Sequence, residues 1–232
     1  MANASRLLLT NDDGIGAPGL EALRLAIAPL GSARVIAPSG PQSGCGHAVT
    51  THQPIDFSIR DDGQVAIGGT PADCVRLALA RLESAPDWVI SGINAGGNLG
   101  VDVYHSGTVA AAREAAIRGV RAISISHYIR KGVPLDWNRA GSLARQVISF
   151  LLEQPTEPLT FWNVNLPHLE PLDPDPEWKF CPVDPSPLPL DYDWDGERVI
   201  YSGVYSQRPR RSESDISVCF SGSIAVSLIR II

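Results

Sequence analysis

Several common motifs and segments are missing from this chain of 232 residues, and each absence excludes a class of protein. The four cysteines are widely spaced and form no C-x-x-C pair, which excludes a zinc ribbon and a thioredoxin-type redox motif. No apolar run approaches the roughly 18 residues that a membrane span needs. The N-terminus has only three leucines after Arg6, too short an apolar region for a signal peptide. We therefore expect a cytoplasmic protein with no membrane partner and with reduced cysteines that fill space.

Motifs for nucleotide cofactors and an excess of positive charge are also absent. The chain has no G-x-x-x-x-G-K-S/T and no G-x-G-x-x-G sequence, so ATPase and dinucleotide-binding functions lose their usual support. The 19 basic and 25 acidic residues give a net charge of −6, which repels a nucleic-acid backbone. We therefore expect no long nucleic-acid partner. A small anionic substrate would need local positive potential from a metal, a helix N-terminus or a few arginines.

Strand and helix patterns alternate along the first 130 residues. Short apolar runs predict buried strands, and segments with helical periodicity separate them. This alternation predicts an α/β fold with a doubly wound, mostly parallel sheet. Strands are expected at 6–9, 33–37, 48–50, 55–59, 65–67 (after a turn at 61–63), 87–90, 122–126, 159–164, 198–205, 216–220 and 224–229, and helices at 18–27, 71–82, 108–118 and 139–153.

The composition changes after residue 155. Ten of the 19 prolines lie between 155 and 189. Because proline has no backbone N–H, this stretch is not expected to form a helix or a central strand. We predict a core at 1–130 that carries the functional site, and at 131–232 a continuation of the core with a β-rich, proline-rich extension. An arm with several apolar residues and little core of its own predicts a homodimer or homotetramer.

Three of the predicted strands run into loops of small oxygen-bearing residues. Asp12 and Asp13 follow the strand at 6–9, Ser43 lies in the loop after 33–37, and Asn94 follows the strand at 87–90. Ligands bind at the carboxyl ends of strands in open α/β sheets, so these oxygens can meet at one site. Since the set contains no thiolate or imidazole, it suits a hard cation such as Mg²⁺, Mn²⁺ or Ca²⁺.

Each of these residues also has a purely structural interpretation. Adjacent aspartates commonly cap a helix or close a turn. Two close carboxylates repel one another unless a cation or a proton lies between them, and the position of Asp12 and Asp13 at the end of the first strand favours the cation. Ser43 and the glycine-rich segment around Asn94 consist of residue types that any turn uses.

Ser106, Gly107 and Thr108 open an alanine-rich helix. Unpaired N–H groups and the helix dipole make such a turn a phosphate cradle, although plain helix capping explains the same residues. A hard cation and an anion cradle together indicate phosphoryl-transfer chemistry. Of the histidines at 47, 52, 105, 127 and 168, only His105 lies beside this turn, and a lone loop histidine is more often structural than catalytic. The run 208–211 is interpreted as a solvated loop, with a lip that attracts an anionic substrate as the alternative.

Five sequence blocks resemble those of a known family, the SurE family of survival-protein-E 5′-nucleotidases, and occur in the family's order. They are Leu9–Gly14, Ala37–Pro38 with Ser43, Gly69–Val75, Ser91–Asn94 with Gly96, Asn98, Gly100 and Asp102, and His105–Val109. Asn163–Pro167 and Ser214–Asp215 with Gly222 resemble later blocks more loosely, and Leu228 stands where the family commonly has proline. The family often exchanges C-terminal segments between subunits.

The resemblance implies a Rossmann-like fold and hydrolysis of nucleoside monophosphates to nucleoside and phosphate, with 3′-nucleotidase and exopolyphosphatase activities as further options. It implies one divalent metal ion per subunit, held by Asp12, Asp13, Ser43 and Asn94. It places Asn98, Ser106, Gly107 and Thr108 around the phosphate, with Asp12, Asp13, Asn98 and Ser106 as the catalytic residues. We expect the cation to polarise a phosphoryl oxygen and to activate a water that attacks phosphorus in line.

Two other functions fit the same residues. A non-catalytic module that binds a phospho-ligand or a metal could use the same fold, because fold alone does not imply chemistry. A phosphatase for polyphosphate or sugar phosphates would keep the chemistry and change the substrate. Release of inorganic phosphate from a panel of such compounds with Mg²⁺ or Mn²⁺ separates these functions.

Overall fold

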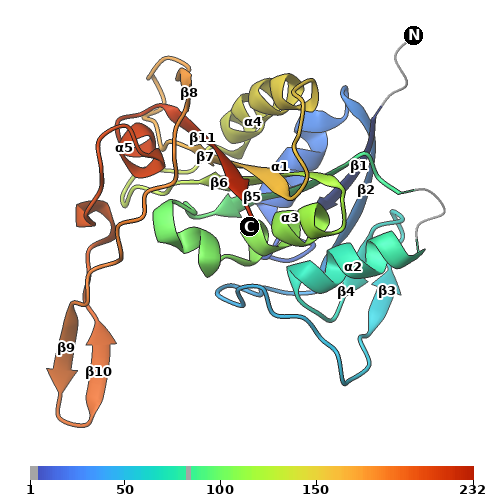
Figure 1. Cartoon of the computed structure of the whole chain (residues 1–232), viewed down its shortest axis with the longest axis horizontal. Helices are drawn as coiled ribbons and strands as arrows, with labels where there is room; N and C mark the ends of the chain where they lie inside the picture. Colours follow the sequence, from blue (N-terminus) through green and yellow to red (C-terminus); the bar gives the residue numbers. More distant parts are fainter. Residues whose placement is uncertain (1–4, 82–84) are drawn as a thin grey trace.

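A nine-stranded sheet lies at the centre of the described chain, which comprises residues 5–81 and 85–232 of this computed structural model (Figure 1). The strand order is β3-β4-β2-β1-β5-β6-β7-β11-β8. The strands of this sheet are β1 (Ser5–Thr10), β2 (Gly31–Pro38), β3 (Phe57–Ile59), β4 (Val65–Ile67), β5 (Trp88–Ala95), β6 (Arg121–His127), β7 (Thr160–Leu166), β8 (Trp178–Phe180) and β11 (Ile224–Arg230).

The middle of the sheet is parallel. From β4 to β7 each strand runs parallel to its neighbours, whereas β3 is antiparallel to β4 and β11 is antiparallel to β7. The outermost strand, β8, is parallel to β11. The predicted doubly wound, mostly parallel α/β sheet is therefore confirmed.

Two helices cover each face of the sheet. Helices α1 (Pro18–Ile27) and α4 (Trp137–Leu152) lie on one face, and α2 (Pro71–Arg81) and α3 (Gly107–Ile117) on the other (Figure 1). The side chains of β1 alternate between these layers, as the pleat of a strand requires. Leu7 and Leu9 join the core under α1 and α4, and Leu8 joins the core under α2 and α3. A strand buried on both faces explains the continuous apolar run at this position.

The remaining elements lie near one end of the sheet. A short 3₁₀-helix, η1 (Gly100–Tyr104), leads into α3, and α5 (Asp215–Phe220) leads into β11. Between β8 and α5 the chain forms a two-stranded hairpin of β9 (Tyr192–Asp195) and β10 (Arg198–Tyr201), followed by η2 (Tyr205–Gln207). Figure 1 shows that this hairpin projects away from the sheet and its helices.

Some predicted elements differ from the observed ones. Residues 216–220 belong to a helix, not a strand, and the carboxylate of Asp215 accepts the N–H of Ile216 at the start of that helix (2.9 Å). Residues 48–50 are not a strand, because the N–H of Thr50 donates to the carboxylate of Asp73 (2.9 Å) instead of to a neighbouring strand. The proline-poor strand β7 lies inside the sheet, so the expectation that 155–189 contains no central strand is wrong there.

The ends of two predicted strands also change. Strand β5 continues through Ser91 to Ala95, with an irregularity in its pairing between Ser91 and Asn94, so Asn94 lies in the end of a strand instead of a loop. Strand β10 ends at Tyr201. The predicted end of the second helix, Leu82, lies outside the described residues. Within the described residues no helix has the length and apolarity to cross a bilayer, and the four cysteines are all free.

Candidate active site

The predicted metal ligands lie where the sheet changes winding direction. Strand β1 lies between β2 and β5, so the chain proceeds to one side of β1 in the first half and to the other side in the second half. Asp12 and Asp13 follow β1, Asn94 is the second-last residue of β5, and Ser43 lies in the loop that follows β2. Ligands of doubly wound sheets bind at this switch point. The structure thus brings the three predicted loops to one edge of the sheet.

A closed turn holds the two aspartates. The side chain of Asn11 donates to the carbonyl of Gly14 (2.9 Å) and accepts from the N–H of Gly14 (3.2 Å). Gly14 has a positive φ of 100°, and a Cβ on it would lie 3.0 Å from the carbonyl carbon of Gly40. Only glycine therefore allows the loops after β1 and β2 to approach this closely.

Each aspartate is held by a different element. The Thr108 hydroxyl, on α3, donates to Oδ1 of Asp12 at 2.5 Å. Oδ2 of Asp13 accepts the N–H of Ala95 in β5 (3.1 Å). Burial raises the pKa of Asp12, the hydrogen bond from Thr108 lowers it, and the neighbouring Asp13 carboxylate raises it again. The net direction is upward and burial is its largest cause, so the charged form of Asp12 is less favourable here than in water.

The first turn of α3 packs directly on Asp12. A Cβ on Gly107 would lie 2.9 Å from both Cβ of Asp12 and Sγ of Cys45, so a side chain at position 107 would push the helix off the carboxylate. Ser106 is the N-cap of this helix, and its Oγ accepts the N–H of Val109 (3.0 Å). The capping interpretation of Ser106 is thus observed, and its predicted contact with phosphate stays a prediction. The Thr108 hydroxyl donates its hydrogen bond to Asp12, a contact that was not predicted from the sequence.

The contacts of the other predicted site residues, Asn94, Ser43 and Asn98, do not by themselves identify a ligand. The Nδ2 of Asn94 donates to the carbonyl of Gly96 (2.7 Å), which leaves its amide oxygen as the atom that a cation would bind. Ser43 is exposed, and the N–H of the preceding residue, Gln42, bonds the carbonyl of Asp12 (2.7 Å). Asn98 is buried, and its Nδ2 donates to Ser126 of β6 (2.7 Å). The structure therefore gives Asn98 a contact within the fold, and its predicted role at phosphate stays a prediction.

Two buried carboxylates tether the loop that carries Ser43. Asp73, from the Gly69–Val75 block, accepts the hydroxyl of Thr50 (2.7 Å) at the start of α2. Glu114 of α3 bonds Nε2 of His47 (2.9 Å). Sequence reasoning noted the block around Asp73 without a role for it, and the structure supplies one: it fixes the end of the Ser43 loop.

A buried arginine ties the C-terminal part to the same region. Nη1 of Arg208 and the hydroxyl of Tyr205 both bond Oδ2 of Asp102 at 2.6 Å, and Asp102 lies in η1, just before α3. The Arg208 side chain is fully buried. The interpretation of 208–211 as a solvated loop is therefore wrong for Arg208. Its sequence neighbours 209–211 are exposed, as expected.

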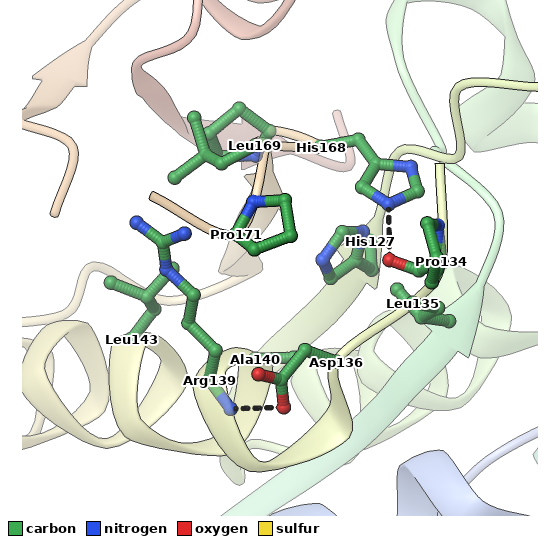
Figure 2. Close-up of a pocket in the computed structure, with 11 residues that line it drawn as sticks. His127, Pro134, Leu135, Asp136, Arg139, Ala140, Leu143, His168, Leu169 and Pro171 are labelled. Carbon is green, nitrogen blue, oxygen red and sulfur yellow. Dashed lines mark hydrogen bonds between the residues drawn. The ribbon is translucent and has the colours of Figure 1, made fainter. Parts of the chain in front are cut away.

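A cavity of about 240 Å³ lies at the end of β6, where His127 forms part of its lining (Figure 2). Figure 2 shows its floor, the first turn of α4 with Asp136 and Arg139, and the two histidine rings of His127 and His168 on one side. Nε2 of His168 donates to the carbonyl of Pro134 (3.2 Å), and Nδ1 of His127 donates to the carbonyl of Tyr128 (2.7 Å). Burial lowers the pKa of His127 to about 4. His127 is therefore neutral near pH 7.

Comparisons with known proteins show which chains and structures this protein is similar to. The family model described as "Survival protein SurE" matches residues 7–184. A Nostoc sp. protein described as a candidate 5′-nucleotidase is 49% identical over 225 residues, covering 97% of this chain and 99% of that protein. The 5′-nucleotidase SurE of Geobacter sulfurreducens is 43% identical over 164 residues, covering 70% and 62%. The crystal structure of a SurE protein from Aquifex aeolicus superimposes with a TM-score of 0.85 at 30% identity, covering 97% and 93%.

The neutral state of His127 makes stability depend on pH. Unfolded histidine takes up a proton near pH 6.5, whereas folded His127 resists protonation until about pH 4. The unfolded chain therefore binds more protons between these values, and the free energy of unfolding should fall as the pH decreases from about 6.5 towards 4, by up to about 1.4 kcal/mol per pH unit from this group. Urea unfolding at several pH values in this range gives the free energy of unfolding as a function of pH. This free energy should change less with pH for His127→Gln than for the parent. An equal pH dependence in the two proteins would contradict the assignment of His127 as neutral.

Proposed function

The chain belongs to the SurE family, and we propose that it is a metal-dependent phosphomonoesterase that hydrolyses nucleoside monophosphates to nucleoside and inorganic phosphate. The observation that carries the proposal is the contact between Asp12 and the first turn of α3 at the switch point of the sheet. A carboxylate pair suits a cation, and the start of a helix suits an anion. A phosphate ester bound to a metal needs a cation site and an anion site next to one another.

The residues present fit a divalent metal ion. Asp12, Asp13, Ser43 and Asn94 offer only oxygen atoms, which Mg²⁺ and Mn²⁺ accept. Within residues 5–81 and 85–232, no ion pair joins Asp12 or Asp13 to a lysine, arginine or histidine. The same residues contain no cluster of three His, Cys, Asp or Glu side chains that could hold a metal, and only two of the four proposed ligands are of these types. We therefore assign one cation per subunit to the Asp12–Asp13 pair.

The chain's own residues position the ester for attack by water. Thr108 fixes the carboxylate of Asp12 through its hydroxyl, and Ala95 fixes that of Asp13 through its N–H. The backbone N–H of Gly107, with the hydroxyl of Ser106, would bind the phosphoryl oxygens and stabilise their charge in the transition state. Asn98 would support the phosphate from the β6 side. A bound divalent cation would polarise the phosphoryl group and activate the attacking water.

The hairpin of β9 and β10 supports a homo-oligomer. Its register places Tyr192, Trp194, Val199 and Tyr201 on one face, and Asp193, Asp195, Arg198 and Ile200 on the other. Trp194 is 77% exposed. A single hairpin is marginally stable in water, and an apolar face on it is typical of a protein contact. We therefore propose that this face packs against another subunit of a homodimer or homotetramer, and we keep the cytoplasm as the expected location.

The metal assignment predicts opposite effects of Asp12→Asn with and without a cation. The amide oxygen can still accept the Thr108 hydroxyl, and the substitution removes the repulsion from Asp13. In EDTA the variant should melt no lower than the parent. In millimolar Mn²⁺ the parent should gain stability as RT ln(1 + [L]/Kd), whereas the variant should gain less because its Kd is higher. Thermal melts under both conditions measure this.

Phosphate release from AMP tests the same assignment by activity. The parent should release phosphate with Mg²⁺ or Mn²⁺ and lose this activity after exhaustive EDTA treatment, and Asp12→Asn should be strongly impaired. A parent that stays fully active without metal would contradict the metal mechanism. A parent that binds AMP and Mn²⁺ without releasing phosphate would support a binding module instead.

The oligomer assignment predicts that polar substitutions on the apolar hairpin face separate the subunits. Trp194→Ser with Val199→Ser alters one cross-strand pair and no part of the core. The double variant should sediment as a smaller species than the parent at micromolar concentration. Leu172→Ser is the matched control, because Leu172 is 98% exposed and lies outside the hairpin. A monomeric parent, or a double variant that sediments like the parent, would overturn the assignment.

A further inference from the structure

A second cavity, of about 370 Å³, opens beside Asp13 between the loops that follow β1 and β2. Its walls include Gly14, Gly16, Pro41, Ala95 and the indole of Trp137. Small-molecule sites commonly have volumes of roughly 300–1,000 Å³. Asp13 thus belongs both to the candidate metal site and to the wall of a cavity that can hold a small molecule.

The walls of this cavity are fixed by contacts within the fold. The N–H of Ile15 bonds the carbonyl of Pro38 (2.8 Å), and the N–H of Ala17 bonds that of Gly14 (3.0 Å). Trp137, the first residue of α4, is half-buried and abuts α1. A Cβ on Gly19 would lie 2.9 Å from the edge of its indole ring. Glycine at position 19 therefore leaves room for the ring beside the cavity, and no large movement is needed to form the pocket.

The charge of the cavity indicates what it can bind. Among the described residues that line it, Asp13 is the only charged one, and none is a lysine, arginine or histidine. A polyphosphate chain in this space would place anionic groups beside a carboxylate without a cationic side chain to balance them. An uncharged group with an aromatic ring fits better, because Trp137 offers an aromatic surface and the loops offer backbone polar groups.

The two aspartates contact different parts of the site. Asp12 contacts the first turn of α3, where the phosphate is expected, whereas Asp13 contacts β5 and the cavity. We propose that the cavity beside Asp13 receives the nucleoside half of the substrate and that Trp137 contacts its base. Trp137 is then a specificity-determining residue. This inference rests on the proposed phosphomonoesterase function.

A comparison of AMP with ribose 5-phosphate isolates the contribution of the base, because both esters share the ribose and the phosphate. With Mn²⁺ the parent should have a higher kcat/KM for AMP than for ribose 5-phosphate or tripolyphosphate. Trp137→Ala should lower kcat/KM for AMP at least about fivefold, the lower end of base–aromatic stacking effects, and should leave that for ribose 5-phosphate nearly unchanged. Trp137→Phe should retain the preference for AMP.

Product inhibition of the parent supplies a readout that does not depend on a variant's folding. Adenosine should inhibit ribose 5-phosphate hydrolysis competitively, and ribose should not. The inference would be overturned if Trp137→Ala lost kcat/KM equally on AMP and ribose 5-phosphate, or kept the parent's value for AMP. It would also be overturned if the parent preferred tripolyphosphate or was not inhibited by adenosine. Failure of the proposed function is distinguishable from these results, since the parent would then release phosphate from none of the three compounds.

Discussion

The repulsion between two adjacent carboxylates is the constraint on which the site depends. Asp12 and Asp13 stand side by side after a strand whose last four residues are buried, and Asp12 is itself buried. The site can hold this pair on two conditions: other groups fix both side chains, and a cation or a proton removes their repulsion. Thr108 and Ala95 provide the first condition from two different elements. Within the described residues no ion pair joins either carboxylate to a basic side chain, and we propose that a bound cation meets the second condition.

Close backbone approach makes this arrangement possible. Gly14 lets the loop after β1 meet the loop after β2, and Gly107 lets the start of α3 reach Asp12. These contacts put a helix N-terminus, which favours anions, next to a carboxylate pair, which favours cations. The tethers from Asp73 to Thr50 and from Glu114 to His47 then fix the Ser43 loop against α2 and α3. The site is thus assembled from helices on one face of the sheet and strands in its middle.

Much of the fold could be predicted from the sequence because its strands are short apolar runs and its helices begin at recognisable residues. Pro18 at the start of α1 and Ser106 as the cap of α3 are local signals. The segment 216–220 was mispredicted because five residues with apolar alternation fit a strand and a helix equally well, and Asp215 decides between them through contacts with distant residues. Site details that join residues about 100 positions apart, such as Thr108 to Asp12 or Arg208 to Asp102, have no local sequence signal.

A second aspartate pair in this chain permits the most direct test. Asp61 and Asp62 are also adjacent, but both are exposed in the turn between β3 and β4. Calorimetric titration with Mn²⁺ should detect one ion per parent chain, binding at least about tenfold weaker to Asp13→Asn, and unaltered binding to Asp62→Asn. Parent and Asp13→Asn chains that bind Mn²⁺ with equal affinity, or a parent that binds none, would contradict the account that the carboxylate pair at the switch point is a cation site.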